Sequence, residues 1–157
     1  MDNARHDMLN SAGLLIVRLG FGGYMLTHGW GKLQMVLAGQ FDQFADPIGI
    51  GTTLSLLLVT FAEFFCALAI MIGLGTRLAA IPLVFAMIVA AFIAHGSDPW
   101  TMGGAVELFF AGETEFPASK EPALLFGFAF LALVFTGPGL FSLDTLIKPK
   151  VLERLGR

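Results

Sequence analysis

The sequence is poor in charge and nearly free of cysteine. Of its 157 residues, 13% are charged and 56% are hydrophobic, and the mean hydropathy is +0.79. Soluble domains carry about 25% charged residues, so this composition predicts an integral membrane protein. Cys66 is the only cysteine, which excludes an internal disulfide and a CxxC redox pair. The nine basic residues form no patch, and we expect no nucleic-acid partner.

Several signatures of metal, nucleotide and haem sites are also missing. No histidine pair has HxxxH spacing, so we assign no metal ligand. The glycines at 20–23 precede no GKS or GKT, which excludes a phosphate loop. With no CxxC and no facing pair of mid-membrane histidines, we expect neither covalent haem nor a thiol redox centre, so electrons would come from a bound quinone or a partner. The N-terminus lacks the basic region of a signal peptide, so we expect the first apolar run to be a retained helix.

Four long apolar runs dominate the sequence. We predict an all-α fold, a four-helix transmembrane bundle in which residues 1–157 form a single membrane domain. The expected helices cover approximately 11–31, 48–74, 78–95 and 122–141, and each crosses about 30 Å of hydrocarbon. A long loop at 97–121, with a short amphipathic turn at 106–110, joins the third and fourth helices. An amphipathic tail follows at 142–157.

The distribution of lysine and arginine predicts the orientation. On one side of four crossings lie Arg5, Arg77, Lys148, Lys150, Arg154 and Arg157, whereas only Lys32 and Lys120 lie on the other. Cytoplasmic loops carry the excess of positive charge, so both termini are expected in the cytoplasm. The loop at 97–121 is then periplasmic or exterior.

Two charged residues are predicted near the middle of the first two helices. Arg18 lies in the first helix and Glu63 in the second, and antiparallel neighbours would let the two side chains meet. An unpaired charge in hydrocarbon is costly, so a partner is expected for each. Such a pair serves either as a structural tie that fixes helix register or as a proton-relay or ligand-orienting pair.

A second polar group is predicted at the outer membrane level. At about 100° per residue, His28 and Lys32 fall within about 80° of Arg18 on the helix. His95 ends the third helix and Glu121 begins the fourth, so the four residues could line one pocket. A histidine there could pass a proton or donate a hydrogen bond to a quinone carbonyl. The alternative is an ordinary set of headgroup-level polar residues, with the lysine reaching to the interface.

Three segments together resemble the DoxX family of small four-helix membrane proteins. They read RLGFGGYMLTHGWGKL, AEFFCALAIMIGLGTRLAA and EPALLFGFAFLALVFTGPGLFSLD. Carried over position by position, the family pattern marks Arg18, His28, Gly29, Lys32, Glu63, Arg77, Gly137, Gly139 and Asp144. The loop at 97–121 departs from the pattern, since it is longer than the family core needs.

The resemblance implies a multi-pass protein of the bacterial cytoplasmic (inner) membrane. Some relatives are quinone-linked subunits of sulfur-compound oxidoreductases, others associate with thiol or oxidative-stress systems, and many have no assigned activity. We therefore predict a membrane subunit of a redox system that binds quinone or quinol and works with a soluble partner. A glycine-rich first helix also favours a homodimer.

We assign roles to seven residues on this interpretation. The catalytic set is His28, as proton donor or acceptor, with Arg18 and Glu63. The ligand-binding set is Lys32, His95, Glu121 and Arg77, although Arg77 is most simply a positive-inside anchor. The competing interpretation is a non-catalytic scaffold, assembly factor or small-molecule transporter, because polar residues inside a small bundle serve ligand passage equally well.

Overall fold

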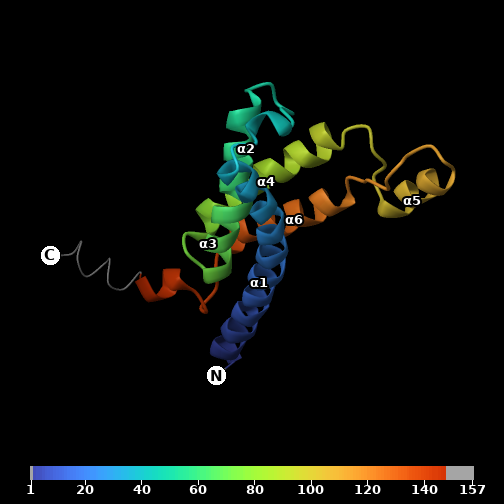
Figure 1. Ribbon diagram of the computed structural model, residues 1–157. Helices are drawn as coiled ribbons and strands as arrows, with labels where there is room; N and C mark the ends of the chain where they lie inside the picture. The colour runs from blue at the N-terminus through green and yellow to red at the C-terminus, as the bar shows by residue number, and fades with distance from the viewer. Residues whose placement is uncertain (1, 148–157) are drawn as a thin grey trace.

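A computed structural model describes residues 2–147, and every regular element in that range is helical (Figure 1). The α-helices are α1 (Asp2–Leu37), α2 (Thr52–Thr60), α3 (Ala67–Ile72), α4 (Thr76–Val89), α5 (Met102–Phe110) and α6 (Glu121–Thr136). A 3₁₀ turn, η1 (Phe41–Gln43), and two π-helical segments, η2 (Phe61–Cys66) and η3 (Ala90–Ala94), complete the set. The prediction of an all-α fold is therefore confirmed for the described residues.

The two π-helical segments continue the helices that contain them. α2, η2 and α3 form one helical run over 52–72, and α4 and η3 form another over 76–94. Three runs are long and apolar enough to cross a membrane, namely Asn3–Leu37, Thr52–Ile72 and Thr76–Ala94. α6 is equally apolar but has 16 residues, which is short for a straight crossing.

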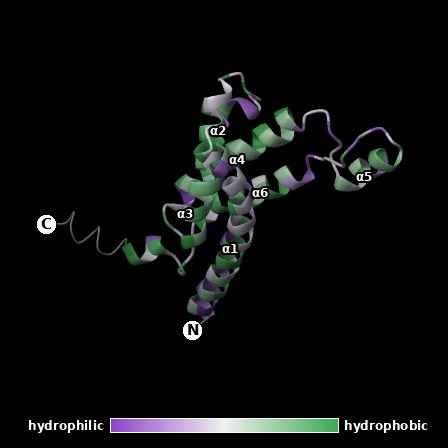
Figure 2. Ribbon diagram, viewed as in Figure 1, coloured by the Kyte–Doolittle hydropathy of each residue, from purple (hydrophilic) through white to green (hydrophobic). Residues whose placement is uncertain are grey.

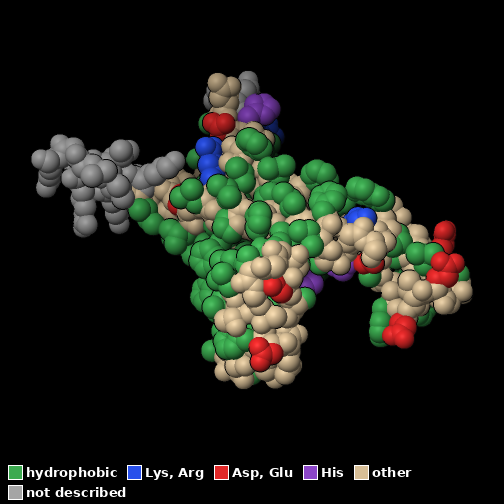
Figure 3. All heavy atoms as spheres, turned by 90° about the horizontal axis from the view of Figure 1, so that it is seen from above, with side chains coloured by type: hydrophobic (Ala, Val, Ile, Leu, Met, Phe, Trp, Pro, Cys, Tyr) green, Lys and Arg blue, Asp and Glu red, His purple; other side chains and the backbone are tan. Residues whose placement is uncertain are grey.

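The exposed hydrophobic residues lie mainly on these apolar helical runs. Figure 2 shows hydrophobic residues over the α2–α4 region and α6, and hydrophilic residues mainly at the loops and chain ends. Figure 3 shows hydrophobic side chains covering the helical middle of the molecule, whereas acidic side chains lie on the outlying lobes. Soluble proteins rarely expose so continuous an apolar surface, so this middle zone fits a hydrocarbon environment.

α4 forms the centre of the core. Ala80, Leu83 and Met87 of α4 and Ala91 of η3 are buried at intervals of three to four residues. These residues define a continuous buried face. α4 runs alongside α6 in Figure 1 and also contacts η2. The alanines on this face let the neighbouring helices approach closely, which favours van der Waals packing where no hydrophobic force acts between helices.

The helix bounds differ from the predicted ones at both ends of the chain. α1 extends beyond 11–31, and Ser11, expected near its start, is buried within it. The predicted extension of the last helix to 141 is wrong: α6 ends at Thr136 because Gly137 has a φ of 77° and Pro138 follows. Of the predicted tail at 142–157, residues 143–147 are helical and 148–157 lie outside the described residues.

The long predicted loop contains a complete helix, α5, which stands away from the core in Figure 1. The Thr101 hydroxyl accepts a hydrogen bond from the Gly104 N–H at 3.2 Å and caps its first turn. A carboxylate oxygen of Glu121 accepts from the Met102 N–H at 2.7 Å. These two acceptors bind N–H groups that a helix leaves unpaired at its start, so the helix can begin at Met102. α5 is thus longer than the predicted turn at 106–110.

Candidate functional site

Arg18 is the most completely buried charged residue in the described chain, with an exposed fraction of 1%. Its guanidinium donates to the carbonyl oxygens of Ile70 and Met71 at 2.9 and 3.1 Å, at the end of α3. It also donates to the carbonyl oxygens of Pro138 and Phe141, the latter at 2.9 Å. A helix ends with unpaired carbonyls and partial negative charge, so a cation there satisfies both.

The segment after α6 closes the same end of the molecule. The Asp144 carboxylate accepts from the N–H groups of Gly75 and Thr76 at 2.8 and 3.3 Å, which caps the start of α4. The Asp144 N–H donates to the Gly73 carbonyl at 2.9 Å. An added Cβ at Gly73 would lie 2.8 Å from the Arg18 Nη2, and its φ is 74°. Hydrogen bonds from Arg18 and Asp144 therefore tie this end of the molecule together, although the buried Thr76 hydroxyl has no partner among the described residues.

The predicted pairing of Arg18 with Glu63 is wrong. Arg18 is occupied by four carbonyl groups, and Glu63 instead binds Lys32. The Lys32 Nζ lies 2.5 Å from the Glu63 Oε2, with 22% of the lysine side chain and 7% of the glutamate side chain exposed. Burial strengthens this attraction but also makes loss of either partner costly. The buried charges thus form a neutral pair rather than an isolated anion.

Gly29 brings α1 against the π-helical segment that carries Glu63. An added Cβ at Gly29 would lie 2.4 Å from the Glu63 carbonyl carbon and 2.5 Å from the Phe64 N, so only glycine fits. Lys32 follows three residues later on the same face of α1. The close backbone approach therefore sets the position from which the lysine reaches the carboxylate. π-helical bulges are frequent at functional sites.

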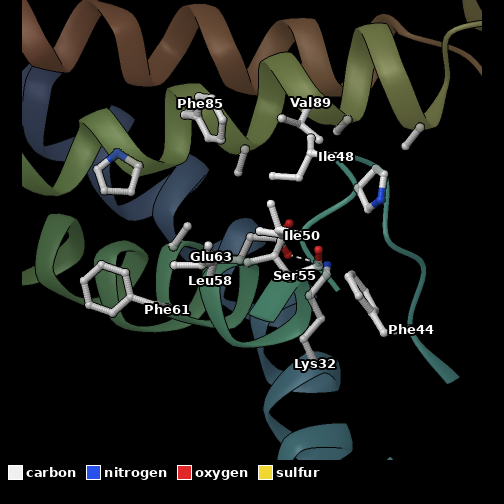
Figure 4. Close-up of a pocket in the computed structure, with 17 residues that line it drawn as sticks. Lys32, Phe44, Ile48, Ile50, Ser55, Leu58, Phe61, Glu63, Phe85 and Val89 are labelled. Atoms are coloured by element: carbon white, nitrogen blue, oxygen red, sulfur yellow. Dashed lines mark hydrogen bonds and ion pairs between the residues drawn. The ribbon is translucent and has the colours of Figure 1, made fainter. Parts of the chain in front are cut away.

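The Lys32–Glu63 pair forms part of the wall of a cavity of about 530 Å³ (Figure 4). One wall comes from α2 and η2, the opposite wall from α4 and η3, and the roof from the loop before α2. Apart from the pair and Ser55, the lining is apolar. Its members are Phe44, Pro47, Ile48, Ile50, Leu58, Val59, Phe61, Ala62, Pro82, Phe85, Ala86, Val89, Ala90 and Ala94. A cavity of this size with few polar groups is typical of a small-molecule site.

Asp46 fixes the roof of the cavity. Its carboxylate accepts hydrogen bonds from the Ile50 and Gly51 N–H groups at 3.0 and 2.7 Å, and from the Ser55 hydroxyl at 2.8 Å. The Ser55 hydroxyl and the Gly51 N–H lower the pKa of Asp46 below the ordinary aspartate value, since they stabilise the anion. The loop is thereby tied to the start of α2.

The comparisons with known proteins place the chain in a family. The DoxX family model matches residues 13–96. The chain belongs to the DoxX family. Neither the curated proteins nor the solved structures gave a match.

Membership of the DoxX family and the three apolar runs identify a multi-pass membrane protein that sits in a lipid bilayer. Every residue that lines the cavity lies between Lys32 and Ala94, inside the part that matches DoxX. α5 and α6 lie outside the matched range. The cavity therefore belongs to the DoxX core of the chain.

His28 lies away from this cavity. Its side chain is exposed on α1, and its ring meets the ring of Phe126 on α6 edge-on, with centroids 6.2 Å apart. His28 and Lys32 point about 40° apart on α1, yet His28 lies one turn earlier and faces α6. The DoxX cavity is lined by Lys32 and not by His28.

The other predicted ligand-binding residues also occupy separate places. The His95 Nδ1 lies 2.8 Å from the Asp98 Oδ2, and Glu121 binds the first turn of α5. Arg77 is exposed beside Gly137, where an added Cβ would lie 2.9 Å from the Arg77 Nε. The structure therefore does not gather His28, Lys32, His95 and Glu121 in one pocket.

Three contributors to the cavity were missed by sequence reasoning. Asp46 precedes a proline and two glycines, a pattern typical of a side chain that binds nearby backbone N–H groups, and this signal could have identified the tied loop. Ser55 had no distinguishing signal among the hydroxyl residues of α2. Gly29 matched the family pattern, but its contact with η2 depends on helix packing.

Proposed function

We propose that this chain is a membrane subunit that binds quinone or quinol in the cavity beside Lys32 and Glu63. The observation that supports this proposal is a single buried ion pair in the wall of an otherwise apolar cavity. Such a lining suits an apolar ring with one or two polar oxygens. We assign to Lys32 and Glu63 the proton-exchanging role that the sequence analysis gave to His28.

The charge of the pair favours a neutral head group. Lys32 and Glu63 sum to zero, so an anionic head group such as a fatty-acid carboxylate would bring a second negative charge beside Glu63. A quinone carbonyl needs only a hydrogen-bond donor. The Lys32 Nζ has three N–H groups, of which one binds Glu63 within residues 2–147, so donors remain for such an oxygen.

The same pair can handle protons. Glu63 can accept a proton from a quinol hydroxyl, and Lys32 can stabilise the oxygen that loses it. Oxidation of the quinol to the quinone releases two protons, one taken by Glu63 and the other by water, and two electrons, which we propose pass to a soluble redox partner; quinone reduction runs the same steps in reverse. The chain would then act as the quinone-binding subunit of an oxidoreductase.

We further propose the architecture that accompanies this function. α6 joins the three longer runs to complete a four-helix bundle, and residues 1–157 form a single domain. Both termini lie in the cytoplasm of a bacterial cell, the membrane is the inner membrane, and α5 lies on the periplasmic side. The excess of lysine and arginine near the termini and the α3–α4 turn supports this orientation.

The test is quinone binding by the purified protein in detergent micelles. The variant replaces both members of the pair, Lys32→Met with Glu63→Leu, because removing one alone would leave a buried unpaired charge and destabilise the fold. We expect saturable binding by wild type, and affinity at least about tenfold weaker in the double variant, since a hydrogen bond from a charged group contributes about 1.5–3 kcal/mol.

His28→Ala is the matched control, since His28 is outside the cavity, and it should bind as wild type does. Equal loss in His28→Ala and the double variant would refute the assignment to the pair. Absence of binding by folded wild type would overturn the quinone proposal in favour of the non-catalytic interpretation.

A further inference from the structure

The cavity is elongated along the helices. On α4 and η3 its lining extends from Pro82 to Ala94, and the twelve steps between these residues span about 18 Å at 1.5 Å per residue. On the opposite wall it extends from Ser55 to Glu63. A benzoquinone ring occupies a small part of such a length, so the site has room for more than the head group.

The two sides of the cavity differ in chemistry. In Figure 4, Lys32, Phe44 and Ser55 gather on one side, together with the paired Glu63 oxygen. Phe61 and Phe85 lie toward the other side, on opposite walls. That side is open, since exposed fractions are 53% for Phe61, 58% for Phe85 and 50% for Leu58. We name Leu58, Phe61 and Phe85 the lateral mouth.

The lateral mouth lies at the middle of the membrane-crossing runs. Phe85 is nine residues from Thr76 and nine from Ala94, the ends of the third apolar run. Phe61 is nine residues from Thr52 and eleven from Ile72, the ends of the second run. Both therefore lie near the centre of the hydrocarbon.

We infer that the site takes a neutral, long-tailed amphiphile that arrives from within the bilayer, with its head at the Lys32–Glu63 pair and its tail leaving through the lateral mouth. This inference rests on the proposed function and specifies its ligand as lipid-soluble. The loop tied by Asp46 lines the opposite side of the cavity, where Ile48 and Ile50 are 37% and 40% exposed, less than the residues of the lateral mouth. An isoprenoid or alkyl tail then stays in hydrocarbon throughout.

The physical consequence is that the tail should add little affinity. A tail already dissolved in lipid gains no hydrophobic free energy by lying along apolar helices. When concentration is expressed as mole fraction in the bilayer, a benzoquinone with a decyl tail and the same ring without the tail should bind wild type within about threefold of each other. A variant with a narrowed lateral mouth should bind the decyl-tailed benzoquinone more weakly than the tailless ring.

The test uses the full chain in lipid nanodiscs and the variant Leu58→Trp, whose larger side chain narrows the mouth. We expect affinity for the decyl-tailed benzoquinone to fall at least tenfold while affinity for the tailless ring stays within twofold of wild type. Ile81→Trp is the matched control, since Ile81 is exposed on α4 but does not line the cavity. It should bind both probes normally.

A second measurement keeps the inference testable if Leu58→Trp folds poorly. A diazirine at the end of the decyl tail should label peptides containing the lateral mouth in wild type. Unchanged decyl-probe affinity in folded Leu58→Trp, or tail labelling confined to 44–50, would overturn the lateral mouth while leaving the quinone proposal intact. Failure of the tailless ring to bind wild type would overturn both.

Discussion

Replacing Arg18 by methionine should destabilise the packing of residues 138–141 against the end of α3. The guanidinium joins the end of α3 to residues 138–141 through four carbonyl oxygens and is almost completely buried. Methionine has a similar side-chain volume, although it is shorter, and it has no donor. Its thioether can fill much of the space but donates to none of the four carbonyls, of which Ile70 keeps the Gly73 N–H as a partner at 3.0 Å.

The loss of unfolding free energy in Arg18→Met can be worked out from these four hydrogen bonds. Four hydrogen bonds from a charged donor, at the lower value of about 1.5 kcal/mol each, give about 6 kcal/mol. Removing a buried cation also removes its desolvation cost, which offsets part of the loss. We therefore expect Arg18→Met to lower the free energy of unfolding by about 2–4 kcal/mol. The free energy of unfolding of Arg18→Lys should lie between those of wild type and Arg18→Met. The lysine ammonium keeps the charge but lacks the planar guanidinium that bonds two segments at once.

The assay is denaturant unfolding in detergent combined with hydrogen exchange. The N–H groups of Leu140 and Asp144 are bonded to the Ser11 hydroxyl and the Gly73 carbonyl, and they should lose protection first in Arg18→Met. Arg5→Met, an exposed change on the same helix, should leave both stability and protection unchanged. Wild-type stability in Arg18→Met, or a loss of stability with these two amides still protected, would refute the reasoning.

Two further predictions concern the cavity. Gly29→Ala should separate α1 from η2, because its Cβ would meet the Glu63 carbonyl carbon at 2.4 Å, and we expect lower stability and weaker quinone binding. Gly31→Ala is the control, because an added Cβ there meets open space; it should leave quinone binding unchanged and should not lower stability, since alanine favours the helix. The lowered pKa of Asp46 predicts that the roof is held at pH above the ordinary aspartate value and loosens as pH falls through that lowered pKa. The protection factor of the Gly51 N–H, which is corrected for the intrinsic pH dependence of amide exchange, should report this loosening, and Asp46→Asn should abolish the change of that protection factor with pH.

The helical fold was predictable because its signals are local. Continuous apolar runs report helices long enough for hydrocarbon, and the left-handed Gly73 and Gly75 mark the turn between two of them. The predicted last helix ran to residue 141 because that length is needed to cross the hydrocarbon. Gly137 and Pro138 instead end α6 at Thr136. Here the backbone preference of glycine and proline decided the boundary.

The polar pairing was less predictable, because residue spacing does not specify which acceptor a long side chain reaches. Carbonyl groups at helix ends carry no residue signature, so the partners of Arg18 were invisible in the sequence. Lys32 reaches Glu63 only because Gly29 allows a backbone approach that depends on the packing of α1 against η2. Charge and depth correctly indicated that each buried charge needs a partner, but not which partner it finds.

Arg18 and Lys32 are both partly or fully buried cations on α1, yet they differ in how completely their donors are used. Arg18 makes four hydrogen bonds to carbonyl oxygens, and little capacity remains in its five N–H groups. Lys32 makes one within residues 2–147 and borders an apolar cavity. A donor without an acceptor in such a place is costly, so a ligand oxygen that satisfies it gains affinity. Changes at Arg18 should therefore lower stability while the folded fraction keeps its quinone affinity, whereas joint replacement of Lys32 and Glu63 should lower affinity with little change in stability.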